Sequence, residues 1–583
     1  MSDHNWPSIG TVVGNTSTDE FTFILQNMSA KLGDIVAVQT QIPADDNTKL
    51  EVTVWGRIIS IDRFNPFFPA EAAQELANSH IDLLDTVLST TRDHLEASVL
   101  IIGRTGAVGS GDLDLVPPRY PVKPSANVLY PSAEAVKELL NAASIEKKKL
   151  HLGNLIGRAD VDVSLTASQV VSRHMAILAM TGGGKTVASR RVIKELAKLK
   201  YPIVIFDPHG DYLGLYEKRA ELGADEVKLV YPEILVTDQT RGTVSDLVSK
   251  MGNKITEAQA PLNSFLIEET AIRGDVQNLE EFLQDMIDEL DRLREAKNEG
   301  GNVPPAIRDL HAASFNPVKR NFINVKKKIE VMRKNNERLR QKFTDYEFLT
   351  LPDPSDEPEK LVAKGQITIF YLAGFDHLTQ STIASLVLEK LFEKRANLTN
   401  DIPPFQIVLE EAHNFIPSRS EGTEGTPSLA TVRKIITEGR KFGTGMLIIS
   451  QRPSRLDETI LAQCNSFLVL RLVNPKDKSF VRSVMENLSE SDANILQTFG
   501  QGQGIVSGQA VRFPLLIQVK FDEDLISQSI GNEDFINEVT DWTPPEEQKA
   551  KKKTENNLKS LKENLNKNRA DRKKRGSGSQ LDF

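Results

Sequence analysis

Short apolar runs rich in Val, Ile and Phe recur through the first hundred residues, where Gly, Asn and Asp separate them. Several short strands at this spacing are typical of a small barrel. We therefore expect an N-terminal β-barrel over residues 1–115. The apolar runs are residues 9–14, 20–26, 34–40, 50–62 and 97–104.

A stretch with many prolines, residues 116–131, follows and predicts a loop at the start of a connector over residues 116–170. Beyond the connector, continuously apolar runs alternate with helical stretches. This alternation predicts βαβ units and a parallel sheet with buried strands, which is an α/β fold. We place this core at residues 171–250 and 361–525. Its apolar runs are residues 175–180, 202–207, 366–372, 405–410, 445–450 and 466–472.

Residues 251–360 depart from that rhythm, because their apolar positions follow the spacing of helices. We interpret this segment as a helical insertion packed beside the sheet, and the alternative is a module that contacts a partner or substrate. The C-terminal segment, residues 526–583, becomes polar and strongly basic after Trp542. A solvated tail is the simplest interpretation. Such a tail can also contact nucleic-acid phosphates or an acidic partner.

The composition narrows the class of protein. A chain of 583 residues is long enough for several domains, and its single cysteine, Cys464, excludes an internal disulfide. We see no secretory signal and no apolar run long enough to span a membrane, so we expect a cytoplasmic protein. The formal net charge of −9 argues against nucleic acid over the whole surface. It leaves room for DNA in a narrow basic channel, because binding depends on local potential.

A candidate phosphate-binding loop stands at residues 179–186, AMTGGGKT, between a predicted strand and a predicted helix. Glycines let the backbone approach phosphate with its N–H groups turned inward, and the helix start adds the positive end of its dipole. The usual pattern begins with glycine, whereas Ala179 stands there in this chain. The alternative is a chance match in a loop. The expected phosphate contacts come from Gly182, Gly183 and Gly184.

A lysine, a threonine and two glutamates are expected to complete this site. We expect Lys185 to reach the β and γ phosphates of ATP and the hydroxyl of Thr186 to ligate Mg²⁺. A predicted buried strand then ends in two carboxylates, Glu410 and Glu411. Glu410 is expected to hold Mg²⁺, and Glu411 is expected to polarise the attacking water as general base. The alternative is that both glutamates simply face solvent.

Other polar residues follow predicted strands at the same edge of the sheet. Asp207 ends the run PIVIFD, and we expect it to support Mg²⁺, since ligands bind at the carboxyl ends of such strands. Gln451 directly follows the run GMLIIS and is expected to sense phosphate or water. Arg440 and Arg452 are candidate cations for transition-state charge, and the alternative for each is a surface ion pair. We expect Arg440 to lie in a glycine-flanked turn, GRKFG.

Taken together, these strings resemble the HerA family of hexameric DNA translocases, within the HerA/FtsK division of RecA-like ATPases. The resemblance extends over most of residues 5–525. Its most specific part is the long stretch from Glu438 to Asp477, which a general P-loop protein has no reason to show. The other strings are IGTVVGNTSTDEFTFIL, VWGRIISI, RHMAILAMTGGGKT, FDPHGDY and LEEAHNFIP.

The resemblance implies a RecA-like core behind a barrel like the one that begins this family's members. It also implies a homo-hexameric ring with double-stranded DNA in its channel and ATP between neighbouring subunits. Arg440 then corresponds to an arginine that reaches the neighbour's ATP, and Arg173 to a position near nucleotide. Relatives work with a nuclease of the NurA type, or with Sir2-like or nuclease-like effectors in antiviral defence. The insertion and the basic tail depart from compact members of the family.

Three functions compete at this point. The first is an ATP-driven double-stranded DNA translocase or helicase. The second is a scaffold ring whose ATP site assembles and switches a partner effector, and DNA stimulation of ATP turnover separates these two. The third is the motor of a conjugation or secretion apparatus, but such motors usually carry membrane helices or dock on membrane proteins.

Overall fold

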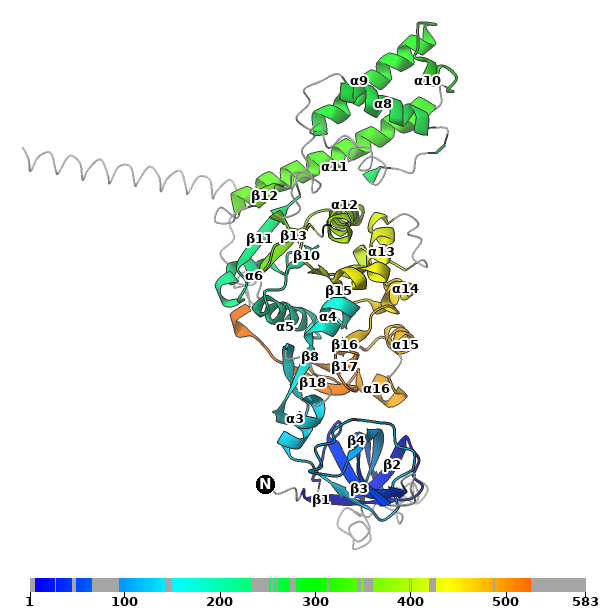
Figure 1. Cartoon of the computed structure of the whole chain (residues 1–583). Helices are drawn as coiled ribbons and strands as arrows, with labels where there is room; N and C mark the ends of the chain where they lie inside the picture. The colour runs from blue at the N-terminus through cyan, green and yellow to red at the C-terminus, as the bar shows by residue number, and fades with distance from the viewer. Residues whose placement is uncertain are drawn as a thin grey trace, which may run out of the picture. The chain divides into compact units, whose positions relative to one another are not determined.

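The computed structural model describes most of residues 6–525 (Figure 1). The predicted basic tail lies outside the described residues. Among the described residues, no helix combines the length and the apolar character needed to cross a bilayer. The residues outside the description are 1–5, 27, 44–48, 65–93, 142–147, 233–250, 253–255, 258, 273–278, 312–313, 343–347, 351–359, 398, 400, 419–425, 486–487 and 526–583.

The first strands close into a six-stranded barrel in the order β1-β2-β5-β4-β3-β6, which confirms the predicted barrel. Alternate side chains of β2, namely Phe21, Phe23 and Leu25, are buried in its core, as a strand with one buried face requires. The strand β6 lies in the stretch that we predicted as a loop, and it pairs with both β1 and β3. The barrel strands are β1 (Ser8–Val13), β2 (Glu20–Leu25), β3 (Ile35–Pro43), β4 (Lys49–Phe64), β5 (His94–Gly106) and β6 (Asn127–Leu129).

A twelve-stranded sheet forms the centre of the α/β core, in the order β12-β11-β13-β10-β14-β15-β9-β16-β17-β18-β7-β8. The first eight strands in this order run parallel, and six of them are the predicted apolar runs. The α/β prediction is therefore confirmed. The parallel strands are β9 (Met175–Leu178), β10 (Ile203–Asp207), β11 (Glu226–Tyr231), β12 (Phe348–Thr350), β13 (Gln366–Tyr371), β14 (Phe405–Leu409), β15 (Thr444–Ser450) and β16 (Ser466–Leu470).

The remaining four strands extend the sheet in antiparallel pairings. Two of them, β7 and β8, come from the stretch that we assigned to the connector. Their buried residues alternate, Leu150 and Leu152 in β7 and Val161, Val163 and Leu165 in β8, so a period of two was present in the sequence. The four strands are β17 (Gln503–Gly508), β18 (Leu515–Val519), β7 (Lys149–Leu155) and β8 (Arg158–Thr166).

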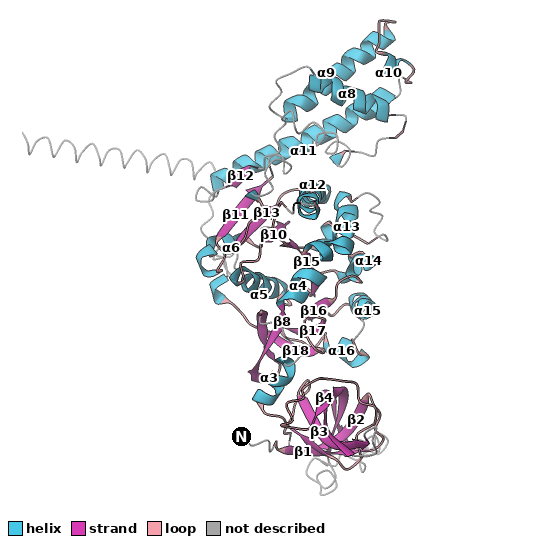
Figure 2. Cartoon of the chain, in the orientation of Figure 1, coloured by secondary structure: helices cyan, strands magenta, loops and turns pink. Residues whose placement is uncertain are grey.

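Helices flank the strands of the core (Figure 2), and the side chains of each strand divide between two buried clusters. In β9, Ala176 and Leu178 join the cluster that contains α12 and α13, whereas Met175 and Ile177 join the cluster that contains α5. The sheet is thus covered on both faces, which explains why its strands are continuously apolar. The core helices are α3 (Ala133–Asn141), α4 (Ala167–Arg173), α5 (Lys185–Lys198), α6 (Leu213–Glu217), α12 (His377–Ala396), α13 (Pro427–Phe442), α14 (Glu458–Leu461), α15 (Pro475–Val484) and α16 (Glu490–Ile495).

The segment between β11 and β12 is helical, as predicted. Its buried side chains, among them Phe282, Leu283 and Leu290 of α9 and Phe322 of α11, recur at helical spacing. They share a buried cluster with α12 and α13, so the insertion packs on the core. Its helices are α8 (Ala260–Ile272), α9 (Leu279–Asn298), α10 (Pro305–Arg308) and α11 (Phe315–Lys342).

Candidate nucleotide-binding site

The predicted phosphate loop connects the end of β9 to the start of α5. Gly182 and Gly184 have positive φ angles of 77° and 96°, which glycine adopts without the steric cost that a side chain incurs. A Cβ atom on Gly184 would also lie 2.9 Å from the backbone nitrogen of Gly502, so that position is closed to larger residues. Gly184 is the residue before the first turn of α5. The loop therefore ends at a helix N-terminus, where N–H groups and the helix dipole favour an anion.

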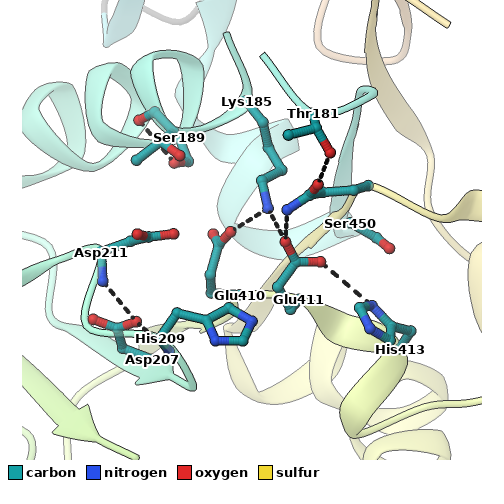
Figure 3. Close-up of polar contacts among 12 residues, drawn as sticks. Thr181, Lys185, Ser189, Asp207, His209, Asp211, Glu410, Glu411, His413 and Ser450 are labelled. Carbon is teal, nitrogen blue, oxygen red and sulfur yellow. Dashed lines mark hydrogen bonds and ion pairs between the residues drawn. The ribbon is translucent and has the colours of Figure 1, made fainter. Parts of the chain in front are cut away.

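The side chain of Lys185 is buried between two carboxylates (Figure 3). Its Nζ lies 2.6 Å from Oε1 of Glu410 and 2.5 Å from Oε1 of Glu411. Burial lowers the pKa of Lys185, but the two carboxylates outweigh burial and hold that pKa above its ordinary value. The glutamates follow β14, and β15 separates β14 from β9. The fold thus brings together three residues that we predicted as one site.

Glu410 is fully buried, and burial raises its pKa to about 7 despite the neighbouring Lys185. The hydroxyl of Tyr212 donates to Oε2 of Glu410 over 2.7 Å. The carboxylate therefore meets a cation at one oxygen and a neutral donor at the other. Burial disfavours the ionised form of this carboxylate, so a further cation nearby would stabilise that form.

Glu411 adopts the left-handed conformation, with φ 46° and ψ 53°. For a residue other than glycine this conformation costs about 1–3 kcal/mol, and such strain is typical of functional sites. Burial raises the pKa of Glu411, but His413, Lys185 and Gln451 outweigh it and lower the pKa to about 2. The Nδ1 of His413 lies 3.3 Å from Oε2 of Glu411.

Gln451 connects this carboxylate to the phosphate loop. Its Nε2 donates to Oε1 of Glu411, and its own Oε1 accepts from the hydroxyl of Thr181. The chain of contacts from Thr181 through Gln451 to Glu411 joins the loop, the end of β15 and the end of β14. The predicted position of Gln451 beside the phosphate site agrees with this arrangement, and its role in sensing phosphate stays a prediction.

Asp207 stands at the end of β10, where we expected it, and its side chain is fully buried. Its Oδ1 accepts the backbone N–H groups of His209, Gly210 and Asp211 at 3.3, 2.8 and 3.1 Å. Its Oδ2 accepts the N–H of Tyr212 at 2.9 Å. Burial raises the pKa of Asp207 to about 6. In this structure the carboxylate shapes the following loop, and its contact with Mg²⁺ stays a prediction.

The residues present suit a metal ion that is held jointly with phosphate. Among the described residues, no group of three His, Cys, Asp or Glu side chains has the arrangement of a metal site. Mg²⁺ usually binds one or two carboxylates together with substrate phosphates, so it needs no complete protein cage. Thr186, in the first turn of α5 and half-buried, and Glu410 are the predicted ligands.

Two predicted arginines lie at the amino edge of the sheet, where the parallel strands begin, whereas the glutamates lie at the carboxyl edge, where these strands end. Arg173 ends α4, just before β9, and Arg440 lies in the last turn of α13, just before β15. The expectation of a glycine-flanked turn at Arg440 was wrong, because Gly439 continues the helix and Gly443 ends it. Gly439 is needed there because a Cβ atom would lie 2.7 Å from the backbone oxygen of Thr444.

The environments of these arginines differ. The guanidinium of Arg173 donates to Oε1 of Gln509. The side chain of Arg440 is exposed and has no hydrogen bond or ion pair within the described part of the chain. Neither arginine therefore contacts the carboxylates of its own subunit.

Two buried hydroxyl groups at the site were not predicted. Tyr212 Oη contacts both Oε2 of Glu410 and, at 2.7 Å, the hydroxyl of Ser189. One signal for Ser189 was available, because it follows Lys185 by four residues on α5 and so shares its face of the helix. Tyr212 ends the string FDPHGDY, but no local pattern shows that its ring reaches Glu410.

Comparison with known proteins gives a consistent result. Residues 150–391 match the family described as "Helicase HerA, central domain". The DNA double-strand break repair helicase HerA of Saccharolobus solfataricus is 25% identical, and the alignment covers 92% of this chain and 96% of that protein. A probable helicase of Methanocaldococcus jannaschii is 25% identical over 91% of this chain and 95% of its own length.

Two further similarities are more limited in extent. The DNA double-strand break repair helicase HerA of Pyrococcus furiosus is 26% identical over 73% of this chain and 78% of that protein. Among solved structures, the plasmid coupling protein TrwB in complex with ADP and Mg²⁺ aligns with a TM-score of 0.44 and 16% identity, covering 66% of this chain and 91% of that one. Its phosphate loop, its paired glutamates and these relatives along most of its length indicate a P-loop ATPase, and the chain is similar to the HerA helicases.

Proposed function

We propose that this protein is an ATP-driven translocase or helicase that acts on double-stranded DNA as a ring of six subunits. The observation that carries the proposal is the division of its charged residues between the two edges of one sheet. Lys185, Glu410, Glu411 and Gln451 meet at the carboxyl edge, whereas Arg440 is exposed at the amino edge. The names of the relatives, which are repair helicases, support DNA as the substrate.

The carboxyl edge supplies the groups that ATP hydrolysis needs. Bound Mg²⁺ would neutralise charge on the phosphates, with Thr186 and Glu410 as its protein ligands. Lys185 would exchange its contacts with the two carboxylates for contacts with the β and γ phosphates. Lys185 is one of the groups that lower the pKa of Glu411, so its departure raises the basicity of that carboxylate. Glu411 would then orient a water molecule and accept its proton.

The amino edge supplies what one subunit lacks. Charge builds on the γ-phosphoryl group in the transition state, and an arginine from a neighbouring subunit can stabilise it. Arg440 suits this role, because it is exposed and has no partner within the described residues. Arg173 lies on α4, which contacts α13, so both arginines lie in one region, and this region would face a neighbouring subunit. Ring assembly would complete each ATP site.

Translocation along DNA accounts for the weak sequence preference that we expect. A motor must accept every base pair that it passes, so its contacts would be to phosphates in a channel. The resemblance to HerA proteins further supports a partner nuclease or effector protein acting beside the ring. Such a partner would take up DNA ends or strands that the motor delivers.

The direct test is ATP turnover with and without DNA. We expect several unrelated duplexes to stimulate turnover equally, and we expect affinity for DNA to fall steeply with salt as counterions are released. Lys185→Ala serves as the background control. Turnover that ignores DNA while rings still form would contradict the motor and favour a scaffold ring. A strong preference for one duplex would contradict the channel.

A further inference from the structure

We infer that Tyr212 is a positioning residue for Glu410: its hydroxyl holds one carboxylate oxygen so that the other faces the cation of the site. This inference rests on the proposed role of Glu410 as a ligand of Mg²⁺. It assigns to the string FDPHGDY a task that its sequence does not reveal. That task is to place the phenol of Tyr212 against the carboxylate of Glu410.

Four side chains from three elements converge at this point. Lys185 and Ser189 come from one face of α5, Tyr212 follows β10, and Glu410 follows β14. The hydroxyl of Tyr212 lies 2.7 Å from Oε2 of Glu410 and 2.7 Å from the hydroxyl of Ser189. Tyr212, Ser189 and Glu410 are each 0% exposed, so water does not compete for these bonds.

The number of available protons fixes the direction of the chain. A phenol has one proton, and an ionised carboxylate can only accept. With Glu410 ionised beside the ammonium of Lys185, Tyr212 donates to Oε2 of Glu410. The phenol oxygen is then left to accept from Ser189, whose hydroxyl also lies 3.1 Å from the backbone oxygen of Thr186. Lys185 meets the other oxygen, Oε1, at 2.6 Å. The two carboxylate oxygens are thus distinguished: Oε2 accepts from the phenol of Tyr212, and Oε1 pairs with the ammonium of Lys185.

The backbone around Tyr212 is held as firmly as its ring. Asp207 accepts the N–H of Tyr212 at 2.9 Å and the three preceding N–H groups as well. A buried carboxylate that accepts several N–H bonds fixes the path of the loop, since breaking any one of them leaves a buried polar group unpaired. Asp207 therefore acts on the site through Tyr212, and the loop presents the phenol at one place.

Removal of the hydroxyl has a defined consequence. In Tyr212→Phe the ring still fills its space, but Oε2 of Glu410 loses its donor in a buried setting. The carboxylate is then free to turn either oxygen toward a cation. Residues that orient a metal ligand typically change metal affinity by about 10–100-fold when they are replaced. We expect the Mg²⁺ requirement to rise by about tenfold or more on this basis.

The experiment measures binding of a fluorescent ATP analogue to the full-length protein while Mg²⁺ is titrated, without DNA. Tyr212→Phe should need more Mg²⁺ for half-maximal binding, whereas binding in EDTA should match that of the unaltered protein. The matched control is Tyr231→Phe. Tyr231 is 1% exposed, and its hydroxyl donates to the backbone oxygen of Met332 at 3.1 Å, away from this site. The Tyr231→Phe variant should have the same Mg²⁺ requirement as the unaltered protein.

Glu410→Gln separates this inference from the proposed function. A raised Mg²⁺ requirement in Glu410→Gln together with an unchanged one in Tyr212→Phe would overturn the positioning role alone. An unchanged requirement in Glu410→Gln would overturn the metal role of Glu410 and the inference with it. Equal weakening by Tyr212→Phe with and without Mg²⁺ would show a general structural defect and also overturn the inference. Should Tyr212→Phe fail to fold, Ser189→Ala tests the same chain and should raise the requirement to a smaller extent.

Discussion

The two edges of the central sheet differ in how fully their charged residues are paired. At the carboxyl edge, Lys185 lies between two glutamates and every one of these side chains is buried. At the amino edge, Arg440 is exposed at the end of α13 and has no partner within the described residues. The seven residues of β15 separate the edges, which corresponds to roughly 20 Å.

On the proposed function, this difference divides the ATP site between one subunit and its neighbour. The carboxyl edge holds the lysine, the carboxylates and the glutamine that we predict to act on ATP, and these side chains are in mutual contact. No arginine contacts Glu410 or Glu411 within the described part of the chain. The amino edge has an arginine without a task in its own subunit. We therefore expect ATP hydrolysis to need a second subunit.

Lys185→Ala is expected to have the largest effect. The phosphates lose their cation, and the two buried glutamates lose the charge between them, so turnover should fall to the background of the assay. Lys198→Ala, on the same helix, removes a cation that pairs with Glu195 at 2.6 Å and should retain turnover. Steady-state ATP hydrolysis at saturating ATP measures both. Normal turnover in Lys185→Ala would disprove the phosphate-loop assignment.

Glu411→Gln should lower turnover by about 10²–10⁴-fold, the usual contribution of a general base. Glutamine keeps the shape and can still accept from Gln451, so ATP should bind and remain intact. Filter binding of labelled ATP and analysis of its products check both parts. Glu393→Gln, on α12 and 3.8 Å from Lys390, is the control and should behave like the unaltered protein. Failure of Glu411→Gln to bind ATP would make Glu411 a structural residue.

His174→Asn tests the amino edge through pH. Burial lowers the pKa of His174 to about 4, and its Nε2 lies 2.9 Å from the backbone oxygen of Ile436. Because the unfolded chain takes up the proton near pH 6.5, the unaltered protein should lose stability as pH falls from 6.5 to 4. The pKa difference corresponds to about 3 kcal/mol.

Asparagine places a neutral polar side chain at this position, where the backbone has φ 56° and ψ 141°, and it does not titrate. The free energy of unfolding of His174→Asn should therefore depend less on pH over that interval. The raised pKa values of Glu410 and Asp207 have the opposite effect, because they make the folded protein less stable as pH rises. This effect is the same in both proteins. Parallel stability curves for the two proteins would contradict a buried neutral histidine.

Local patterns were sufficient to predict much of this structure. The string AMTGGGKT, with a strand before it and a helix after it, predicts the phosphate loop because each part is adjacent in sequence. The parallel strands are continuously apolar, so β9, β10 and β13 to β16 were all expected. The barrel was predicted from its short strands, except for β6, whose three residues lie among prolines.

The sequence was less informative wherever a contact joins distant residues. Tyr212 and Glu410 are 198 positions apart, and only the sheet order brings them together. Asp207 was predicted to support Mg²⁺ because of its place at a strand end, and that stays a prediction, but the four backbone N–H groups that its oxygens accept were not foreseen. Arg440 was placed in a turn because two glycines flank GRKFG, but Gly439 fits inside a helix that packs against Thr444.

The central claim, that Arg440 of one subunit completes the ATP site of its neighbour, is open to one direct measurement. Arg440→Ala subunits and Glu411→Gln subunits are mixed from the dissociated state, and ring formation is checked by mass. In a mixed ring, an Arg440→Ala subunit supplies Lys185 and Glu411 while its Glu411→Gln neighbour supplies Arg440. Lys441→Ala is the matched control, since Lys441 is the next exposed cation on α13.

We predict that pure Arg440→Ala rings bind ATP but hydrolyse it about 10³–10⁵-fold more slowly than unaltered rings. Mixed rings should regain turnover that neither pure ring shows, and Lys441→Ala rings should keep theirs. Pure Arg440→Ala rings that hydrolyse ATP as fast as the unaltered protein would contradict the claim.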